Sequence, residues 1–155
     1  MKTALPAIRV HIANQQERLA PDFAWLKGLV RTVLGGEGIK SAQINLVLLT
    51  DEAIHVLNRR FLEHDEPTDV LTFPMSGPGA KTLEGEVLIS TETAERTAGE
   101  QGHAAWNEAA LYVIHGLLHL CGYDDHAQRD RAEMRQRERH YLAQLGLKLS
   151  GEQTF

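Results

Sequence analysis

The stretch AWNEAALYVIHGLLHL, at residues 105–120, is a long apolar segment that fixes the centre of the fold. Its apolar residues continue around all sides of a helix, and a helix of this kind is buried by its neighbours. Gly122 follows two residues later, and glycine commonly ends a helix because it adopts the left-handed conformation without strain. We therefore expect a buried helix from Ala105 to Leu120, around which the other elements pack.

The N-terminal half alternates strands and helices. Residues 8–13, IRVHIA, alternate apolar and polar side chains as a half-buried strand does. FAWLKGLVRTVL, at residues 23–34, has apolar residues at helical spacing and is stopped by Gly35 and Gly36. AQINLVLLT, at residues 42–50, predicts a second strand, and Thr50 is a suitable N-cap for a helix over residues 51–61.

A strand–loop–strand segment occupies the middle of the chain. VLTFPM at residues 70–75 and EGEVLIS at 84–90 predict strands, and SGPGAKT lies between them. Ser90 or Thr91 can cap a short helix that ends near residue 102, and the charged residues 126–146 predict a terminal amphipathic helix closed by Gly146. The pattern indicates an α+β protein, a single domain over residues 1–155, with a small mixed sheet and about five helices.

Composition limits the classes of function. A chain of 155 residues with 43% hydrophobic and 24% charged residues is typical of one globular domain. No stretch approaches the roughly 20 apolar residues of a membrane-spanning helix. Pro6, Arg9 and His11 interrupt the N-terminal apolar residues, and Cys121 is the lone cysteine, so we expect a cytoplasmic protein. The net charge of −5 requires a local basic patch for any contact with nucleic acid.

Two histidines of the apolar helix indicate a metal site. His115 and His119 are four residues apart, so both imidazoles project from one helical face. A bare pair of this kind is as compatible with hydrogen-bonded core histidines as with metal. The following GYDDH segment favours metal, because Asp124, Asp125 or His126 can turn back as a third ligand. Three protein ligands leave one position open, as catalytic zinc sites do.

Gly116 distinguishes this helix from the H-E-x-x-H helix of zinc peptidases. In that motif the residue after the first histidine is the glutamate that acts as general base. A metal site without this carboxylate suits phosphodiester hydrolysis, in which stabilisation of charge dominates the barrier. A peptidase that uses another carboxylate remains the alternative.

Three separated motifs resemble the YbeY family of endoribonucleases and rRNA maturation factors. They are HGLLHLCGYDD at residues 115–125, LNRRF at 57–61 and DEPTDVLTFP at 65–74. The resemblance implies a single-strand-specific, metal-dependent endoribonuclease that acts in 16S rRNA 3′-end maturation and in late-stage quality control of 70S ribosomes. It further implies rRNA or other single-stranded RNA and ribosomal proteins as partners, and neither DNA nor a membrane.

The resemblance also assigns residues. It implies that one zinc ion is bound by His115 and His119, and that Arg59 is functionally important. The common family ending is G-Y-D-H, but here the position three residues after Gly122 is Asp125, and His126 follows one residue later. We favour Asp125 as the third ligand because it keeps the spacing, with His126 as the alternative. A carboxylate adds negative charge, which would widen the choice of divalent metal.

Several charged residues have both a functional and a structural interpretation. Arg59 can donate two parallel hydrogen bonds to a phosphate, or it can form a surface ion pair, whereas we assign Arg60 to the surface. Asp65, Thr68 and Asp69 surround Pro67 and are expected to stabilise a turn. The arginines of the terminal helix alternate with Asp130, Glu133 and Glu138, which predicts a solvated, salt-bridged face.

The leading hypothesis is therefore a zinc-dependent endoribonuclease in which Arg59 offsets charge on the phosphate. The second is a non-catalytic ribosome-assembly factor whose metal is structural. The third, a small zinc metallopeptidase, is disfavoured by Gly116.

Overall fold

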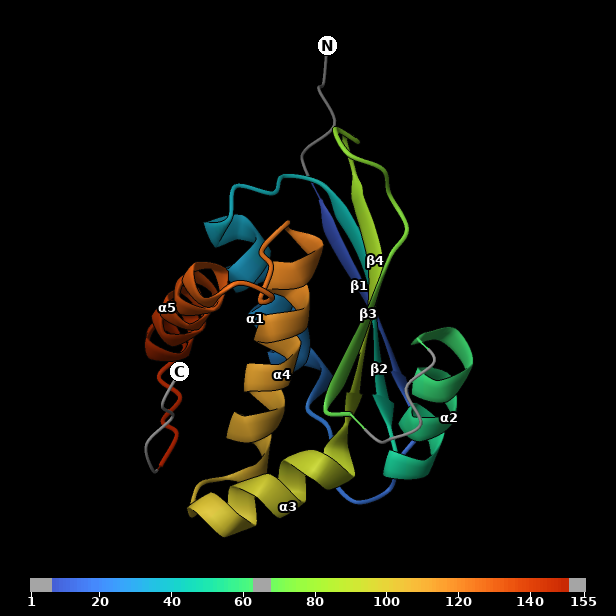
Figure 1. Cartoon of the computed structure of the whole chain (residues 1–155), viewed down its shortest axis with the longest axis vertical. Coiled ribbons are helices and arrows are strands. Elements are labelled where there is room, and N and C mark those ends of the chain that lie inside the picture. Colours follow the sequence, from blue (N-terminus) through green and yellow to red (C-terminus); the bar gives the residue numbers. More distant parts are fainter. Residues whose placement is uncertain (1–6, 63–67, 151–155) are drawn as a thin grey trace.

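Helices cover both faces of a central sheet in the computed structural model, which describes residues 7–62 and 68–150 (Figure 1). Within these ranges the chain forms four strands and five helices. In order they are β1 (Ile8–Asn14), α1 (Phe23–Gly36), β2 (Ala42–Leu49), α2 (Asp51–Leu62), β3 (Val70–Pro74), β4 (Leu83–Ser90), α3 (Thr91–Gln101), α4 (Ala105–Leu120) and α5 (Gln128–Gln144). The predicted α+β class and mixed sheet are confirmed.

The sheet has the strand order β1-β2-β4-β3. β1, β2 and β4 are parallel to one another, whereas β3 is antiparallel to β4. β3 therefore forms one edge of the sheet, next to the strand that leads into α3. β3 contacts α4, so this edge of the sheet lies beside the helix that carries His115 and His119.

The buried helix α4 lies on the same face of the sheet as α1, and α2 lies on the opposite face (Figure 1). α4 contacts β3, β4, α1, α3 and α5, so it is the centre of the core, as the sequence predicts. Its residues Ile114, Leu117 and Leu118 are fully buried. A smaller apolar cluster, formed by Leu49, Ile54, Leu71 and Leu88, lies under α2.

Gly116 allows α4 to approach the sheet closely. A Cβ atom at this position would lie 2.7 Å from Val87 Cγ1 and 3.1 Å from Thr72 Cγ2. Real Cβ contacts are rarely this short, so any side chain would push the helix and the sheet apart. The glycine thus fixes the distance between the two histidines of α4 and the edge of the sheet.

Several predicted helix boundaries are confirmed by their caps, but the expected stop at Gly35 and Gly36 is wrong: α1 continues through both glycines and ends before Gly38, which has a positive φ of 80°. The Thr50 hydroxyl accepts a hydrogen bond from Ala53 N–H at 3.1 Å, and Ser90, rather than Thr91, caps α3 through Thr93 N–H at 3.1 Å. Gly122 and Gly146 have positive φ angles of 107° and 71°. Of the turn residues, Asp65 and Pro67 lie outside the described ranges.

None of the helices in the described part of the chain is both long and apolar enough to span a membrane.

Candidate metal centre

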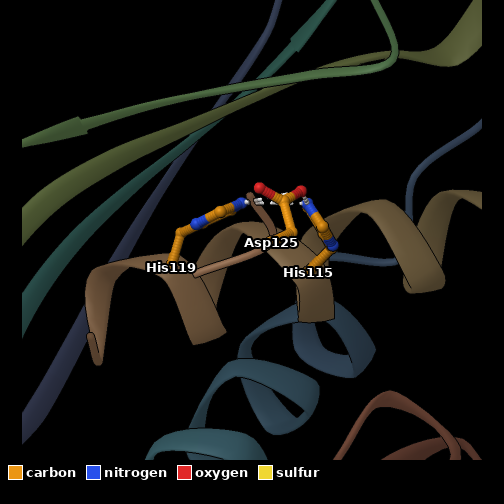
Figure 2. A group of neighbouring side chains, drawn as sticks. All are labelled: His115, His119 and Asp125. Atoms are coloured by element: carbon orange, nitrogen blue, oxygen red, sulfur yellow. Dashed lines mark hydrogen bonds and ion pairs between the residues drawn. The ribbon is translucent and has the colours of Figure 1, made fainter. Parts of the chain in front are cut away.

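His115 and His119 point their Nε2 atoms toward one another from adjacent turns of α4 (Figure 2). The two Nε2 atoms lie 3.0 Å apart, and the rings meet edge to face with centroids 4.6 Å apart. Both side chains are partly exposed rather than sealed in the core. The spacing of four residues therefore brings the imidazoles together, as the sequence predicts.

Asp125 completes a three-residue cluster. Its Oδ2 atom lies 3.5 Å from His115 Nε2 and 3.6 Å from His119 Nε2. Ligand atoms about 2.0–2.2 Å from a tetrahedral zinc ion lie about 3.3–3.6 Å from one another, so the two separations from Asp125 match a common ion, and the two Nε2 atoms, at 3.0 Å, lie slightly closer together. Among the described residues, this group is one of two in which His, Cys, Asp or Glu donor atoms gather within 4.8 Å.

The end of α4 explains how Asp125 reaches the histidines. Tyr123 N–H donates to Leu118 O and Gly122 N–H to His119 O, both at 3.0 Å, which is the Schellman pattern of a helix end. The left-handed Gly122 then turns the chain back along the helix. Asp124 Oδ1 accepts the N–H of Asp125 at 2.7 Å, which holds the following residue in place.

His126, the alternative third ligand, lies away from the cluster. Its side chain is 87% exposed, and its Nε2 atom is 3.3 Å from Asp124 Oδ1. Asp124, Asp125 and His126 form the second group of potential ligands, but Asp124 and His126 are exposed. The structure thus brings Asp125 to both histidines and leaves His126 at the surface.

Hydrogen bonds at the Nδ1 atoms indicate the tautomers of the two histidines. His119 Nδ1 lies 3.0 Å from the Tyr123 carbonyl oxygen, and His115 Nδ1 lies 2.6 Å from Glu138 Oε2. A carbonyl and a carboxylate accept hydrogen bonds, so both Nδ1 atoms carry the proton. Both Nε2 lone pairs then face Asp125, which is the donor set that a divalent cation requires.

Glu138 is the residue of this centre that sequence reasoning missed. The prediction of a solvated face is wrong at this position, because the Glu138 side chain is 0% exposed. A signal was present: Met134, Glu138, Tyr141 and Leu142 follow the spacing of one buried helical face. A glutamate on an otherwise apolar stripe points to a specific partner, here His115.

A groove of about 300 Å³ opens beside the cluster. His115 and Asp125 line it together with residues from the start of β3, from α4 and from α5: Asp69, Val70, Glu108, Leu111, Tyr112, Arg135 and Glu138. Burial raises the pKa of Tyr112, so its hydroxyl stays protonated and can donate a hydrogen bond. The cluster is therefore open to a ligand on the side of the sheet edge.

A second network holds the turn that follows α4. The Glu37 carboxylate, next to the end of α1, accepts hydrogen bonds from Tyr141, from Arg137 at 2.5 Å and from Tyr123. Burial favours the neutral form of Glu37, but these hydrogen bonds outweigh it and hold its pKa below the usual value. The ionised carboxylate thus ties α1 and α5 to Tyr123, two residues before Asp125.

Arg59 lies on α2, across the sheet from α4 (Figure 1). Its side chain is exposed, and none of the described residues that line the groove comes from α2. The structure therefore does not bring Arg59 into the groove with His115 and Asp125. Its predicted contact with phosphate stays a prediction.

The fold and the cluster define a small α+β domain with a candidate metal centre of two histidines and one aspartate on a buried helix. A family model described as Endoribonuclease YbeY matches residues 11–146. The chain belongs to this family.

Relatives and a solved structure resemble most of the chain. An Endoribonuclease YbeY of Pelotomaculum thermopropionicum is 41% identical over 149 residues, which cover 89% of this chain and 97% of the relative. One of Moorella thermoacetica is 37% identical, covering 79% and 86% of the two chains. The solution structure of a Thermotoga maritima protein superposes with a TM-score of 0.65 at 28% identity, covering 90% of this chain and 89% of that one.

Proposed function

We propose that this chain is a zinc-dependent endoribonuclease that hydrolyses phosphodiester bonds in single-stranded RNA. The observation that carries the proposal is the convergence of His115, His119 and Asp125 on one point beside an open groove. The printed names of the relatives, Endoribonuclease YbeY, support RNA as the substrate. By the same resemblance, we propose action on rRNA in the cytoplasm, in 16S rRNA maturation and ribosome quality control, with ribosomal proteins as partners.

The donor set suits a catalytic ion. Two imidazole nitrogens and one carboxylate oxygen are normal zinc ligands, and a three-ligand site leaves a position for water or substrate. When bound, such an ion stabilises charge on the phosphate and lowers the pKa of water. His115, His119 and Asp125 would hold the ion, with Glu138 and the Tyr123 carbonyl orienting the histidines and the turn after Gly122 presenting Asp125.

Positive charge is scarce in the groove. Arg135 is the one basic side chain among its described lining residues, and its Nη1 atom is 3.1 Å from Glu138 Oε1. A guanidinium has five N–H donors, so it can bind this carboxylate and a phosphate oxygen together. We therefore assign Arg135 to the substrate phosphate, alongside the role predicted for Arg59.

The geometry supports the two rival functions less well. A structural zinc site is closed by four protein ligands, whereas this cluster has three among the described residues and borders a groove. A peptidase glutamate at position 116 has no space, because even a Cβ atom there would lie 2.7 Å from Val87 Cγ1. A peptidase would therefore need another carboxylate as its base, and the printed name of the relatives, Endoribonuclease YbeY, favours neither rival function.

The test is cleavage of an end-labelled single-stranded RNA by highly purified protein. We expect cleavage by the zinc-loaded parent, with loss of at least about 100-fold after metal removal or in His115→Ala. The His115→Ala preparation controls for contaminating nuclease, and His140→Ala, which changes an exposed histidine of α5, should cleave as the parent does. Equal cleavage by the parent and by His115→Ala would contradict the proposal.

A further inference from the structure

Glu138 is a buried carboxylate whose two oxygens contact different groups. Oε2 lies 2.6 Å from His115 Nδ1, and Oε1 lies 3.1 Å from Arg135 Nη1. The side chain is 0% exposed, and its neighbours on the buried face of α5, Met134 and Leu142, are apolar. The carboxylate therefore connects α5 to the first histidine of the candidate metal centre.

Packing alone does not explain a glutamate at this position. Removing a carboxylate from water is unfavourable, and replacing a buried ion pair with apolar side chains of similar size is often neutral or stabilising. A leucine or methionine would continue the apolar stripe of α5 at lower cost. The contact with His115 is what an apolar residue cannot supply.

The two histidines are supported unequally. His119 Nδ1 donates to the neutral backbone carbonyl of Tyr123, whereas His115 Nδ1 donates to a carboxylate. A carboxylate fixes the ring orientation and makes the opposite nitrogen a stronger electron donor to a metal. A backbone carbonyl fixes the orientation with less charge, so His115 is the ligand whose strength depends on another side chain.

We propose that Glu138 is a positioning residue of the metal centre, which holds His115 with Nε2 toward Asp125 and strengthens it as a ligand. This inference rests on the proposed metal-binding role of His115. It makes α5 part of the centre, although α5 supplies none of the three ligands.

The test measures zinc affinity by competition with a chromogenic chelator, which does not depend on RNA cleavage. Glu138→Gln keeps the size of the side chain and can still accept a hydrogen bond, but it loses the charge. Glu138→Leu loses both. We expect zinc affinity to fall about 10–100-fold in Glu138→Gln and at least as far in Glu138→Leu.

Two control variants separate positioning from other effects. Glu100→Gln makes the same change at an exposed position of α3 and should keep the zinc affinity of the parent within about twofold. Arg135→Gln removes the other partner of Glu138 but leaves the contact with His115. It should bind zinc as tightly as the parent or more tightly, because a nearby positive charge is lost.

The outcomes distinguish this inference from the proposed centre itself. If His115→Ala does not weaken zinc binding, the centre is wrong. If His115→Ala abolishes binding while Glu138→Gln and Glu138→Leu stay within about twofold of the parent, only the role of Glu138 is wrong. Equal losses in Arg135→Gln and Glu138→Gln would assign the effect to the ion pair and overturn the inference. So would failure of both Glu138 variants to fold by circular dichroism, since Glu138 would then be a structural residue.

Discussion

The Nε2 atoms of His115 and His119 lie 3.0 Å apart while both Nδ1 atoms are bound to acceptors. Two neutral imidazoles in these tautomers direct their lone pairs at each other, an arrangement that is stable only with a cation or a proton between them. Asp125 Oδ2 adds a negative charge about equally far from both, at 3.5 and 3.6 Å. A cation at this point would therefore satisfy both imidazole lone pairs and the carboxylate charge together.

Gly116→Ala should lower the free energy of unfolding by about 1 kcal/mol. The added Cβ atom would lie 2.7 Å from Val87 Cγ1, and overpacking of this kind costs about 1–3 kcal/mol, partly offset by the gain of about 1 kcal/mol in helix propensity. Urea unfolding measures the change. Gly28→Ala, in α1 with nothing within 4 Å of the new Cβ, is the control and should stabilise. Equal stabilisation by both variants would contradict the close approach of α4 to the sheet.

Arg135→Gln should lower kcat/KM for RNA cleavage about 10–100-fold, because a charge-assisted hydrogen bond to phosphate is lost. Arg59→Gln should lower it about tenfold if the role predicted from the sequence is correct. Arg60→Gln, at the neighbouring exposed arginine of α2, should leave the rate unchanged. Unchanged kcat/KM in Arg135→Gln would exclude Arg135 as the phosphate ligand, and equal effects of Arg59→Gln and Arg60→Gln would remove the specific role of Arg59.

Cys121 should react slowly with Ellman's reagent in the native protein. Burial, with a smaller contribution from Glu37, raises the pKa of the Cys121 thiol to about 12. The thiolate is the reactive form, so at mildly alkaline pH we expect a rate at least about 100-fold lower than in urea-unfolded protein. Cys121 is the single cysteine, so the signal has one source. Similar rates in the native and unfolded states would show that the thiol is accessible and ionised.

Stability should depend on pH through Glu37. Its pKa is lower in the folded state than in the unfolded state, so the unfolded state binds more protons as the pH falls. The contribution of Glu37 is present above about pH 4.3 and is lost as the pH falls through the folded-state pKa. Glu37→Gln should therefore lower the unfolding free energy by about 1–3 kcal/mol at neutral pH, with a smaller difference in acid. A difference that is constant from neutral pH down to about pH 3 would contradict the assignment.

The sequence predicts the elements well because each has a local signal. The cap at Thr50 and the glycines at 122 and 146 depend on a few neighbouring residues, and the structure has them where they were expected. The strand order and the edge position of β3 depend on contacts between distant segments. No local pattern contains that information, so only a mixed sheet could be predicted.

The candidate site likewise has one part that local sequence patterns predict and another part that they do not. The pairing of His115 with His119 follows from helical periodicity, whereas the choice between Asp125 and His126 depends on how the chain turns after Gly122. The Asp124 turn, which directs His126 into solvent, follows from backbone geometry rather than from spacing. Glu138 lies on a separate helix, 23 residues after His115 in the chain. Its neighbours in sequence are alternating charged residues, a pattern that predicts exposure rather than burial.

The most direct test of the centre is the metal content of the purified parent, Asp125→Ala and His126→Ala, measured by elemental analysis after equilibration with zinc. We predict one zinc ion per chain in the parent and in His126→Ala, and a largely empty site in Asp125→Ala. An empty site in His126→Ala together with full occupancy in Asp125→Ala would contradict the centre formed by His115, His119 and Asp125.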